Sequence, residues 1–191
     1  LCVYVFNFLF ENVSMNLQPT LENERIKLVP LSPNDFEKLF AVASDPEVWE
    51  QHPNKDRYKR EVFEKFFEGA VKSNGAFLVY DAKTDDVIGS SRFYDLNAET
   101  KTILIGYSFL AKKNWGGTYN HAMKNLMINY AFQFVDHIQF HIGANNIRSQ
   151  TAIQRLGAKK MGELNLAYYG EQKNLNFIFQ IDKSDWKNRL Q

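Results

Sequence analysis

The sequence predicts a single α/β (α+β) domain in which a mixed, mostly antiparallel central sheet carries helices on both faces. Three observations favour this fold class. Segments with period-two apolar alternation, typical of strands, are interspersed along the chain with segments of helical period. Of the 191 residues, 45% are hydrophobic, which suits one domain with a sizeable core. The order of the segments mixes strands and helices, which indicates a mixed sheet covered by helices.

Composition limits the classes of partner. The formal net charge is +1, so no global field attracts nucleic acid or a membrane, and any anion site must be local. No apolar run approaches the roughly 20 residues of a membrane span. The single cysteine, Cys2, offers neither a disulfide framework nor a metal cluster, and we expect a cytoplasmic protein.

The N-terminal stretch is unlike the rest of the chain. Leu1–Phe10 is apolar but lacks the basic start and the small-residue cleavage site of a signal peptide. We therefore treat residues 1–20 as an N-terminal extension. Two interpretations stay open: a natural start at Met15 behind a misassigned segment, or a true added strand or dimer arm.

The first third of the chain predicts one strand followed by helices. Polar and apolar residues alternate over Arg25–Leu31, which predicts the first strand. Ser32 is a helix-capping residue before an apolar stripe of helical spacing. A second short helix begins at Asp45, and a longer one covers Arg57–Lys72 and stops at Ser73-Asn74-Gly75.

The middle of the chain predicts a hairpin, a third strand and a helix. The strands Ala76–Tyr80 and Val87–Tyr94 flank turn residues and should form the hairpin. A further strand covers Ile103–Ala111. After the turn Lys112–Gly117, helical spacing begins at Thr118.

The last third predicts a strand, a helix and two strands. The strand covers His137–Ile142, and the last two cover Lys160–Tyr168 and Asn174–Ile181. The helix Ile147–Leu156 should bury a line formed by Ile147, Ala152, Ile153 and Leu156. His137 and His141 have no third ligand nearby in the sequence, so we expect no metal site.

Gly116 and Gly117 lie between a strand and a helix, an arrangement that can bind an anion. The first turn of a helix has unpaired N–H groups and the positive end of the dipole, and glycines let a phosphate approach. The turn lacks the endings of a nucleotide-triphosphate loop and of a dinucleotide fingerprint. A plain strand-to-helix turn is the alternative.

A family resemblance adds to this interpretation. The run Lys113-Asn114-Trp115-Gly116-Gly117-Thr118-Tyr119 resembles the acetyl-coenzyme A pyrophosphate loop of the GNAT family (GCN5-related N-acetyltransferases), in particular its RimJ/RimL-type branch, which acetylates ribosomal-protein N-termini. Of the pattern Gln/Arg-x-x-Gly-x-Gly/Ala, Gly116 matches, Lys113 stands for Gln/Arg, and Thr118 departs from it. The segment Asn146-Ile147-Arg148-Ser149, followed by Leu156-Gly157-Ala158, is similar to the family's Asn-x-x-Ser … Leu-Gly-Phe motif. The resemblance covers about Leu21 to Trp186 and makes 21–191 the acetyltransferase domain.

The resemblance implies an acetyl-coenzyme A-dependent N-acetyltransferase. Its acceptor would be a primary amine, in a protein N-terminus or a small molecule, and the chain would be a monomer or homodimer that binds no nucleic acid, membrane or metal. The strands 103–111 and 137–142 should splay apart and admit the pantetheine arm. The implied cofactor-binding residues are Phe109, Leu110, Ala111, Lys113, Trp115, Gly116, Gly117, Thr118, Tyr119, Asn120, Asn146 and Ser149. Lys112, Lys113 and Arg148 are either phosphate ligands or ordinary surface charges.

The chain departs from the family at two catalytic positions. Leu104 stands where many relatives carry a Glu base, and Ile153 stands where many carry a Tyr acid. The resemblance leaves Ser149 as the catalytic hydroxyl, a helix cap being the alternative. Other side chains considered for base, water-relay or acceptor contacts are Tyr107, His141, Tyr169, Trp49, His52 and Tyr58. Leu104 and Ile153 also favour the alternative function, a non-catalytic acyl-coenzyme A-binding sensor.

Overall fold

Eight strands form one sheet in the order β1-β2-β3-β4-β5-β6-β8-β7 in the computed structural model, which describes residues 14–167 and 172–188. All neighbouring strands are antiparallel except β5 and β6, which run parallel. The strands are β1 (Leu21–Glu22), β2 (Ile26–Pro30), β3 (Ala76–Asp81), β4 (Val87–Asn97), β5 (Thr102–Leu110), β6 (His137–Gly143), β7 (Lys159–Ala167) and β8 (Lys173–Asp182). The predicted mixed, mostly antiparallel sheet is therefore confirmed.

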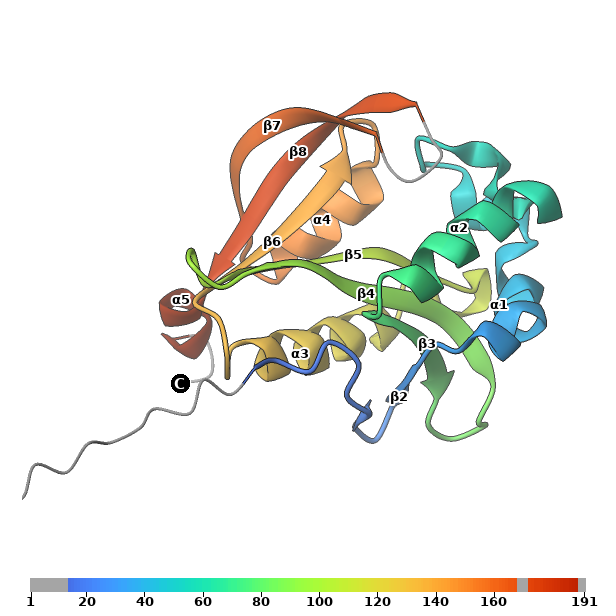
Figure 1. Cartoon of the computed structure of the whole chain (residues 1–191), viewed down its shortest axis with the longest axis horizontal. Coiled ribbons are helices and arrows are strands. Elements are labelled where there is room, and N and C mark those ends of the chain that lie inside the picture. The colour runs from blue at the N-terminus through green and yellow to red at the C-terminus, as the bar shows by residue number, and fades with distance from the viewer. Residues whose placement is uncertain (1–13, 168–171, 189–191) are drawn as a thin grey trace, which may run out of the picture.

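Helices cover both faces of this sheet, as predicted (Figure 1). The α-helices are α1 (Phe36–Ala43), α2 (Arg60–Lys72), α3 (Tyr119–Ala131), α4 (Ile147–Arg155) and α5 (Lys183–Asn188), and the 3-10 turns are η1 (Pro33–Asp35), η2 (Pro46–Trp49), η3 (Lys55–Tyr58) and η4 (Lys112–Asn114). One buried cluster joins α1 and α2 to the sheet, and a second joins α3 and α4 to it. The sheet thus separates two apolar layers.

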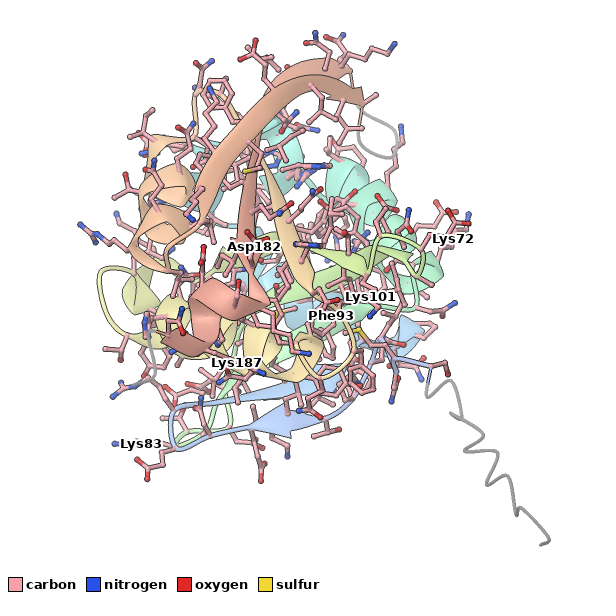
Figure 2. The ribbon with its side chains drawn as sticks, turned by 90° about the vertical axis from the view of Figure 1, so that its left-hand side faces the viewer. Lys72, Lys83, Phe93, Lys101, Asp182 and Lys187 are labelled. Atoms are coloured by element: carbon pink, nitrogen blue, oxygen red, sulfur yellow. The ribbon has the colours of Figure 1, made fainter. Side chains whose placement is uncertain are left out.

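Apolar burial stabilises both layers. The α2 side is rich in aromatic rings, and Phe63 and Phe66 pack there with ring centroids 5.4 Å apart. On the α3 side, Phe93 is fully buried, and Figure 2 places it inside the molecule while Lys72 and Lys83 project at its edge. Full burial of such a ring contributes about 2 kcal/mol before the entropy of ordering is counted.

Local sequence accounts for where the elements begin and end. The Asp35 carboxylate accepts a hydrogen bond from the Ser32 amide at 2.9 Å, which fixes the entry to η1 and α1. Asp45 accepts from the Glu47 amide at the start of η2. Beyond α2, Asn74 adopts the left-handed conformation (φ 48°) that commonly ends a helix.

Three sequence predictions need correction or refinement. Ile147 does not belong to the buried line of α4: it is 61% exposed, because the first residue of this helix faces outward. The short helix predicted at Asp45 is the 3-10 turn η2, and the helix predicted from Arg57 begins at Arg60, after η3.

Part of the predicted N-terminal extension packs on the domain. Met15 is buried in the α3-side cluster, and the Tyr130 hydroxyl donates to the Asn16 carbonyl at 2.8 Å. Residues 1–13 and the segment 168–171, which includes Tyr169, lie outside the described residues. Among the helices that the structure describes, none combines the length and the apolarity needed to cross a membrane.

Candidate functional site

The strands β5 and β6 diverge soon after they start, as predicted. They pair only from Thr102 to Leu104 on β5 and from His137 to Gln139 on β6. Beyond that point β5 continues beside β4, and β6 continues beside β8. The backbone edges that face each other are therefore left unbridged by the sheet.

A bulge in β5 contributes to this divergence. The register between β4 and β5 shifts, because Ser90 pairs with Phe109 whereas Arg92 pairs with Gly106. The extra residue lies on β5, where Tyr107 has a φ of 53°, a conformation that is strained for a bulky side chain. Such a bulge bends the strand and redirects the side chains around it.

A cavity of about 700 Å³ occupies the gap between the strands. Its walls come from η2 and η3 on the α2 side of the sheet, from β5 and β6, and from α3 and α4 on the other side. A cavity of this volume can enclose a whole drug-sized molecule or part of a larger, coenzyme-sized ligand. The cavity crosses the sheet and connects its two faces.

Most of the predicted cofactor-binding residues line this cavity. The lining includes Phe109, Leu110, Trp115, Gly116, Gly117, Asn120, Asn146 and Ser149. Four others do not belong to the lining: Ala111, Lys113, Thr118 and Tyr119. The fold thus brings together the end of β5, the loop before α3 and the start of α4, whereas the four residues named last lie outside the cavity lining.

The residues outside the lining have partners of their own. Lys113 lies 3.7 Å from the Asp86 carboxylate, and the Tyr119 hydroxyl donates to Asp81 at 2.6 Å. The Ala111 amide donates to the Ile88 carbonyl at 2.7 Å. Because bonded and non-bonded pairs alternate along an antiparallel ladder, the Leu110 amide faces away from β4, towards the gap.

The loop before α3 keeps its backbone accessible. Gly116 has a φ of 68°, and nothing lies within 4 Å of a Cβ atom built on it. The N-cap residue of α3, Thr118, makes no side-chain capping bond, so its hydroxyl does not cap the first-turn N–H groups. Nearby, the buried Asn114 Oδ1 has no hydrogen-bond partner among the described residues.

Trp115 and Arg148 connect this loop to α4. The Trp115 indole N–H donates to the Leu110 carbonyl at 2.8 Å, and the Arg148 guanidinium lies 3.8 Å from the centre of the indole ring. Burial lowers the pKa of Arg148 below its usual value, but the group stays cationic. Lys112, by contrast, pairs with Glu47 at 2.5 Å.

The start of α4 presents a capped helix and a hydroxyl. Asn146 Oδ1 accepts from the Ser149 amide at 3.1 Å, so Asn146 acts as the N-cap. Ser149 itself is half-buried and lines the cavity. One turn further on, Ile153 presents an apolar side chain to the same space.

The α2 side of the cavity is aromatic and includes buried cations. Trp49, His52, Tyr107 and His141 line it, whereas Tyr58 packs in the α2-side cluster instead. The Asn54 amide donates to His52 Nδ1 at 3.0 Å, and desolvation, followed by the nearby Arg57 charge, lowers the pKa of His52 to about 3. His52 is therefore neutral near pH 7.

Burial perturbs two further groups on this side. The Arg92 guanidinium lies 3.9 Å from the centre of the Tyr107 ring, and burial lowers its pKa to about 10. Burial also lowers the pKa of His141.

No group of three or more His, Cys, Asp or Glu residues within 14–167 and 172–188 is arranged to hold a metal ion. His137 instead pairs with Asp182 at 2.7 Å.

Among the lining residues that sequence reasoning did not assign to the site are three buried polar side chains, Arg57, Asn114 and Lys124. A signal existed for Lys124, which shares a helix face with Ile128 and Ala131 at the i, i+4 and i+7 positions, and all three are buried. Arg57 and Asn114 lie in 3-10 turns, where no periodicity marks a buried position.

Comparisons with known proteins agree with this geometry. The sequence model of the acetyltransferase (GNAT) domain matches residues 25–159, which is most of the chain, so the chain belongs to this family. The fold is similar to that of a GCN5-related N-acetyltransferase from Brucella melitensis, with a TM-score of 0.77, 19% identity, and coverage of 89% of this chain and 81% of that chain.

Two further solved structures share the fold. One is an acetyltransferase of the GNAT family from Bacillus anthracis, with a TM-score of 0.70, 17% identity, and coverage of 87% of this chain and 99% of that chain. The other is Mycobacterium smegmatis RimJ in complex with CoA-disulfide, with a TM-score of 0.66, 14% identity, and coverage of 87% of each chain.

Proposed function

We propose that this member of the GNAT acetyltransferase family transfers the acetyl group of acetyl-coenzyme A to a primary amine, in a protein N-terminus or a small molecule. The observation that supports this most directly is the cavity between the diverging strands β5 and β6, which ends at the accessible loop before α3. A long, flexible thiol cofactor with phosphates at one end matches a cleft of this form.

The residues present fit acetyl-coenzyme A. The Leu110 amide faces the gap, and Asn114 Oδ1 is a buried acceptor without a partner among the described residues. Pantetheine carries two amides, which would satisfy such groups. The loop Trp115–Asn120 would hold the pyrophosphate through backbone N–H groups, with Arg148 nearby as a cation.

The remaining predicted cofactor-binding residues would have narrower roles than the resemblance implies. Among Phe109, Leu110 and Ala111, the ladder favours Leu110 for a pantetheine contact, because the Ala111 amide already pairs with Ile88. Lys113, Thr118 and Tyr119 would contribute through their backbone N–H groups, since their side chains lie outside the lining. Asn146 would orient α4 as its cap and offer its amide N–H₂ group to the cofactor.

Acetyl transfer requires a neutral amine, donors for the developing oxyanion and a proton for the departing sulfur. Acetyl-coenzyme A supplies a thioester carbon that an amine can attack directly. Backbone amides that the bulge frees from pairing with β4 would stabilise the negative charge on oxygen. Ser149 would donate a hydrogen bond to the sulfur, and Tyr107 or His141 would pass on the proton from the amine.

The acceptor would enter from the α2 side. There Trp49 and Phe109 pack with ring centroids 4.8 Å apart and form an apolar wall that limits access of water to the reacting atoms. No carboxylate belongs to the cavity lining within the described residues. A polycation would find no complementary charge there, which favours an acceptor that presents a single amine.

One observation favours a second candidate function, a non-catalytic acyl-coenzyme A sensor. Leu104 and Ile153, which replace the acid–base groups of many relatives, are only 6% and 4% exposed, and their apolar side chains can neither donate nor accept a proton. A sensor would bind acetyl-coenzyme A without turnover on any amine.

The test combines calorimetry with a thiol-release assay. Acetyl-coenzyme A and coenzyme A should bind, ATP should not, and thiol release should depend on one class of amine in a panel of N-terminal peptides, amino acids and small amines. Binding without release across the panel would favour the sensor. Binding of ATP without binding of coenzyme A would contradict both functions.

A further inference from the structure

One lysine of α3 is buried at the cleft. Lys124 is 3% exposed and lines the cavity between β5 and β6. Its Nζ donates to Ser108 Oγ at 2.5 Å and lies 3.5 Å from Ser91 Oγ. Lysines are rarely buried without a paired charge, so this position needs a physical account.

Nothing near Lys124 in the described part of the chain offsets its charge. Burial is the sole cause of the shift in its pKa, which falls from 10.5 to about 7, and its hydrogen-bond partners are neutral hydroxyls. Besides Lys124 itself, the titratable groups on the lining of the cavity are Tyr94 on β4, Tyr107 on β5, His121 on α3, His141 on β6, Arg148 and Arg155 on α4, and His52 and Arg57 on the α2 side. None of these carries a negative charge near pH 7.

The position of the amine is fixed relative to the bulge. Ser108 directly follows Tyr107, the bulged residue, and its hydroxyl also donates to the Gly106 carbonyl at 3.2 Å. On the other side, Nζ lies 5.9 Å from the centre of the Phe140 ring, and Phe140 is the first β6 residue beyond the end of β5 pairing. The amine thus sits where the two strands part. Surface lysines such as Lys83 project away from the fold (Figure 2).

We propose that Lys124 supplies the proton that neutralises the coenzyme A thiolate as it departs from the acetyl group. The inference rests on the proposed function. The amine nitrogen of the acceptor forms a bond to the acetyl carbon, the carbon–sulfur bond breaks with its electron pair on sulfur, and a proton moves from Lys124 Nζ to that sulfur. The proton lost by the acceptor amine restores Lys124 through solvent.

Two features single out Lys124 for this role. Ile153, on the same side of the sheet, is apolar and cannot donate, and a serine hydroxyl such as that of Ser149 does not ionise near neutral pH. A net proton must come from a group whose pKa lies near the working pH, and that of Lys124 is about 7. Ser149 would hydrogen-bond the sulfur without being the source of the proton.

The decisive measurement follows the thiol of bound coenzyme A rather than turnover. A lysine beside a thiol lowers the thiol pKa from its usual value of about 8.5, often to about 7 or below. The thiol of bound coenzyme A can be titrated by the ultraviolet absorbance of its thiolate. The midpoint of this titration should lie at least about one pH unit lower in the wild type than in Lys124→Met. Affinity for desulfo-coenzyme A should change less than about twofold, because it carries no sulfur.

Control variants separate this role from a structural one. Lys124→Arg keeps a cation that cannot release its proton, so it should retain the thiolate signal but lose about 100-fold in kcat. Ser149→Ala should keep the alkaline fall of kcat that the wild type shows near the pKa of Lys124, and Lys124→Met should lose it. Lys83→Met, at an exposed site, should behave as the wild type.

Each contrary result has a distinct meaning. If coenzyme A binds but its thiol titrates alike in wild type and Lys124→Met, this inference is overturned while the proposed function stands. If neither coenzyme A nor acetyl-coenzyme A binds, both are overturned. Stoichiometric acetylation of Lys124 itself, detected by mass spectrometry, would also overturn it, because an amide nitrogen cannot serve as the proton donor.

Discussion

Substitution of Lys124 by Met should stabilise the ligand-free protein below neutral pH and lose this advantage as the pH rises. Lys124 is 3% exposed, and methionine is an unbranched side chain that can fill much of the same space without a charge. In the wild type, folding brings this amine from water to a buried site where its hydrogen-bond partners among the described residues are two serine hydroxyls. The cost of that transfer depends on whether the amine carries its proton.

The sign and the size follow from the shift in pKa. The pKa of Lys124 is about 7 in the folded protein against 10.5 for a free lysine, so between these values the unfolded chain binds one more proton than the folded one. The free energy of unfolding of the wild type therefore rises with pH through this window, by about 1.4 kcal/mol per unit. Over two pH units above neutral, the wild type should gain roughly 3 kcal/mol relative to Lys124→Met.

Urea unfolding of both proteins at a series of pH values measures this directly. The difference between their free energies of unfolding cancels the titration of groups that the two proteins share. Lys83→Met serves as the control for the loss of an exposed lysine. A flat curve for Lys124→Met would mean that its amine is hydrated or paired with an anion in solution, and the argument from burial would fail.

Three other predictions concern the loop and α4. Gly116→Glu should abolish coenzyme A binding in calorimetry, because a carboxylate would enter the phosphate site. Gly116→Ala carries the same backbone strain at a φ of 68° but adds no charge and meets no atom within 4 Å, so it should bind more tightly than Gly116→Glu; equal binding by both variants would contradict the loop assignment. Ser149→Ala should lower kcat about tenfold with little change in the affinity for acetyl-coenzyme A, and unchanged steady-state kinetics would remove its hydroxyl from the reaction. Asn146→Ala should lower the free energy of unfolding by about 1 kcal/mol through loss of the bond to the Ser149 amide, whereas Asn146→Asp should not; urea unfolding decides, and equal stability of both would refute the cap.

The sequence was most informative where periodicity and turn chemistry agreed. The hairpin of β3 and β4, the strand β5 and the helix α3 lie close to their predicted positions, because alternation or helical spacing extends over a whole element in each. The prediction that β5 and β6 diverge rested on the family resemblance. The structure confirms it, because pairing between the two strands ends at Leu104. Local patterns alone do not specify where two distant strands stop pairing.

The parts that sequence reasoning missed depend on tertiary contacts. The bulge at Tyr107 places a bulky residue at a φ of 53°, which its intrinsic preference disfavours and only its surroundings enforce. Ile147 was assigned to the interior on hydrophobicity, but its position at the first residue of α4 turns it outward. Lys124 was not singled out from the sequence, although its spacing from Ile128 and Ala131 places it on the buried face of α3.

The placement of Lys124 on α3 links two halves of the proposed reaction. The N-terminal turn of α3, which begins at Tyr119, would hold the cofactor phosphates, and Lys124 lies five residues later on the same 13-residue helix. At 1.5 Å per residue these positions are about 7.5 Å apart along the axis, a separation fixed by the helix itself. Phosphate binding would therefore fix one end of the cofactor relative to Lys124, and the pantetheine arm would cover the remaining distance to the amine along the gap. Arg148, by contrast, lies on α4 beside Trp115 of the loop, so Arg148→Met should weaken binding of coenzyme A in calorimetry more than it changes the pH dependence of kcat; an equal loss in both would contradict this division of roles.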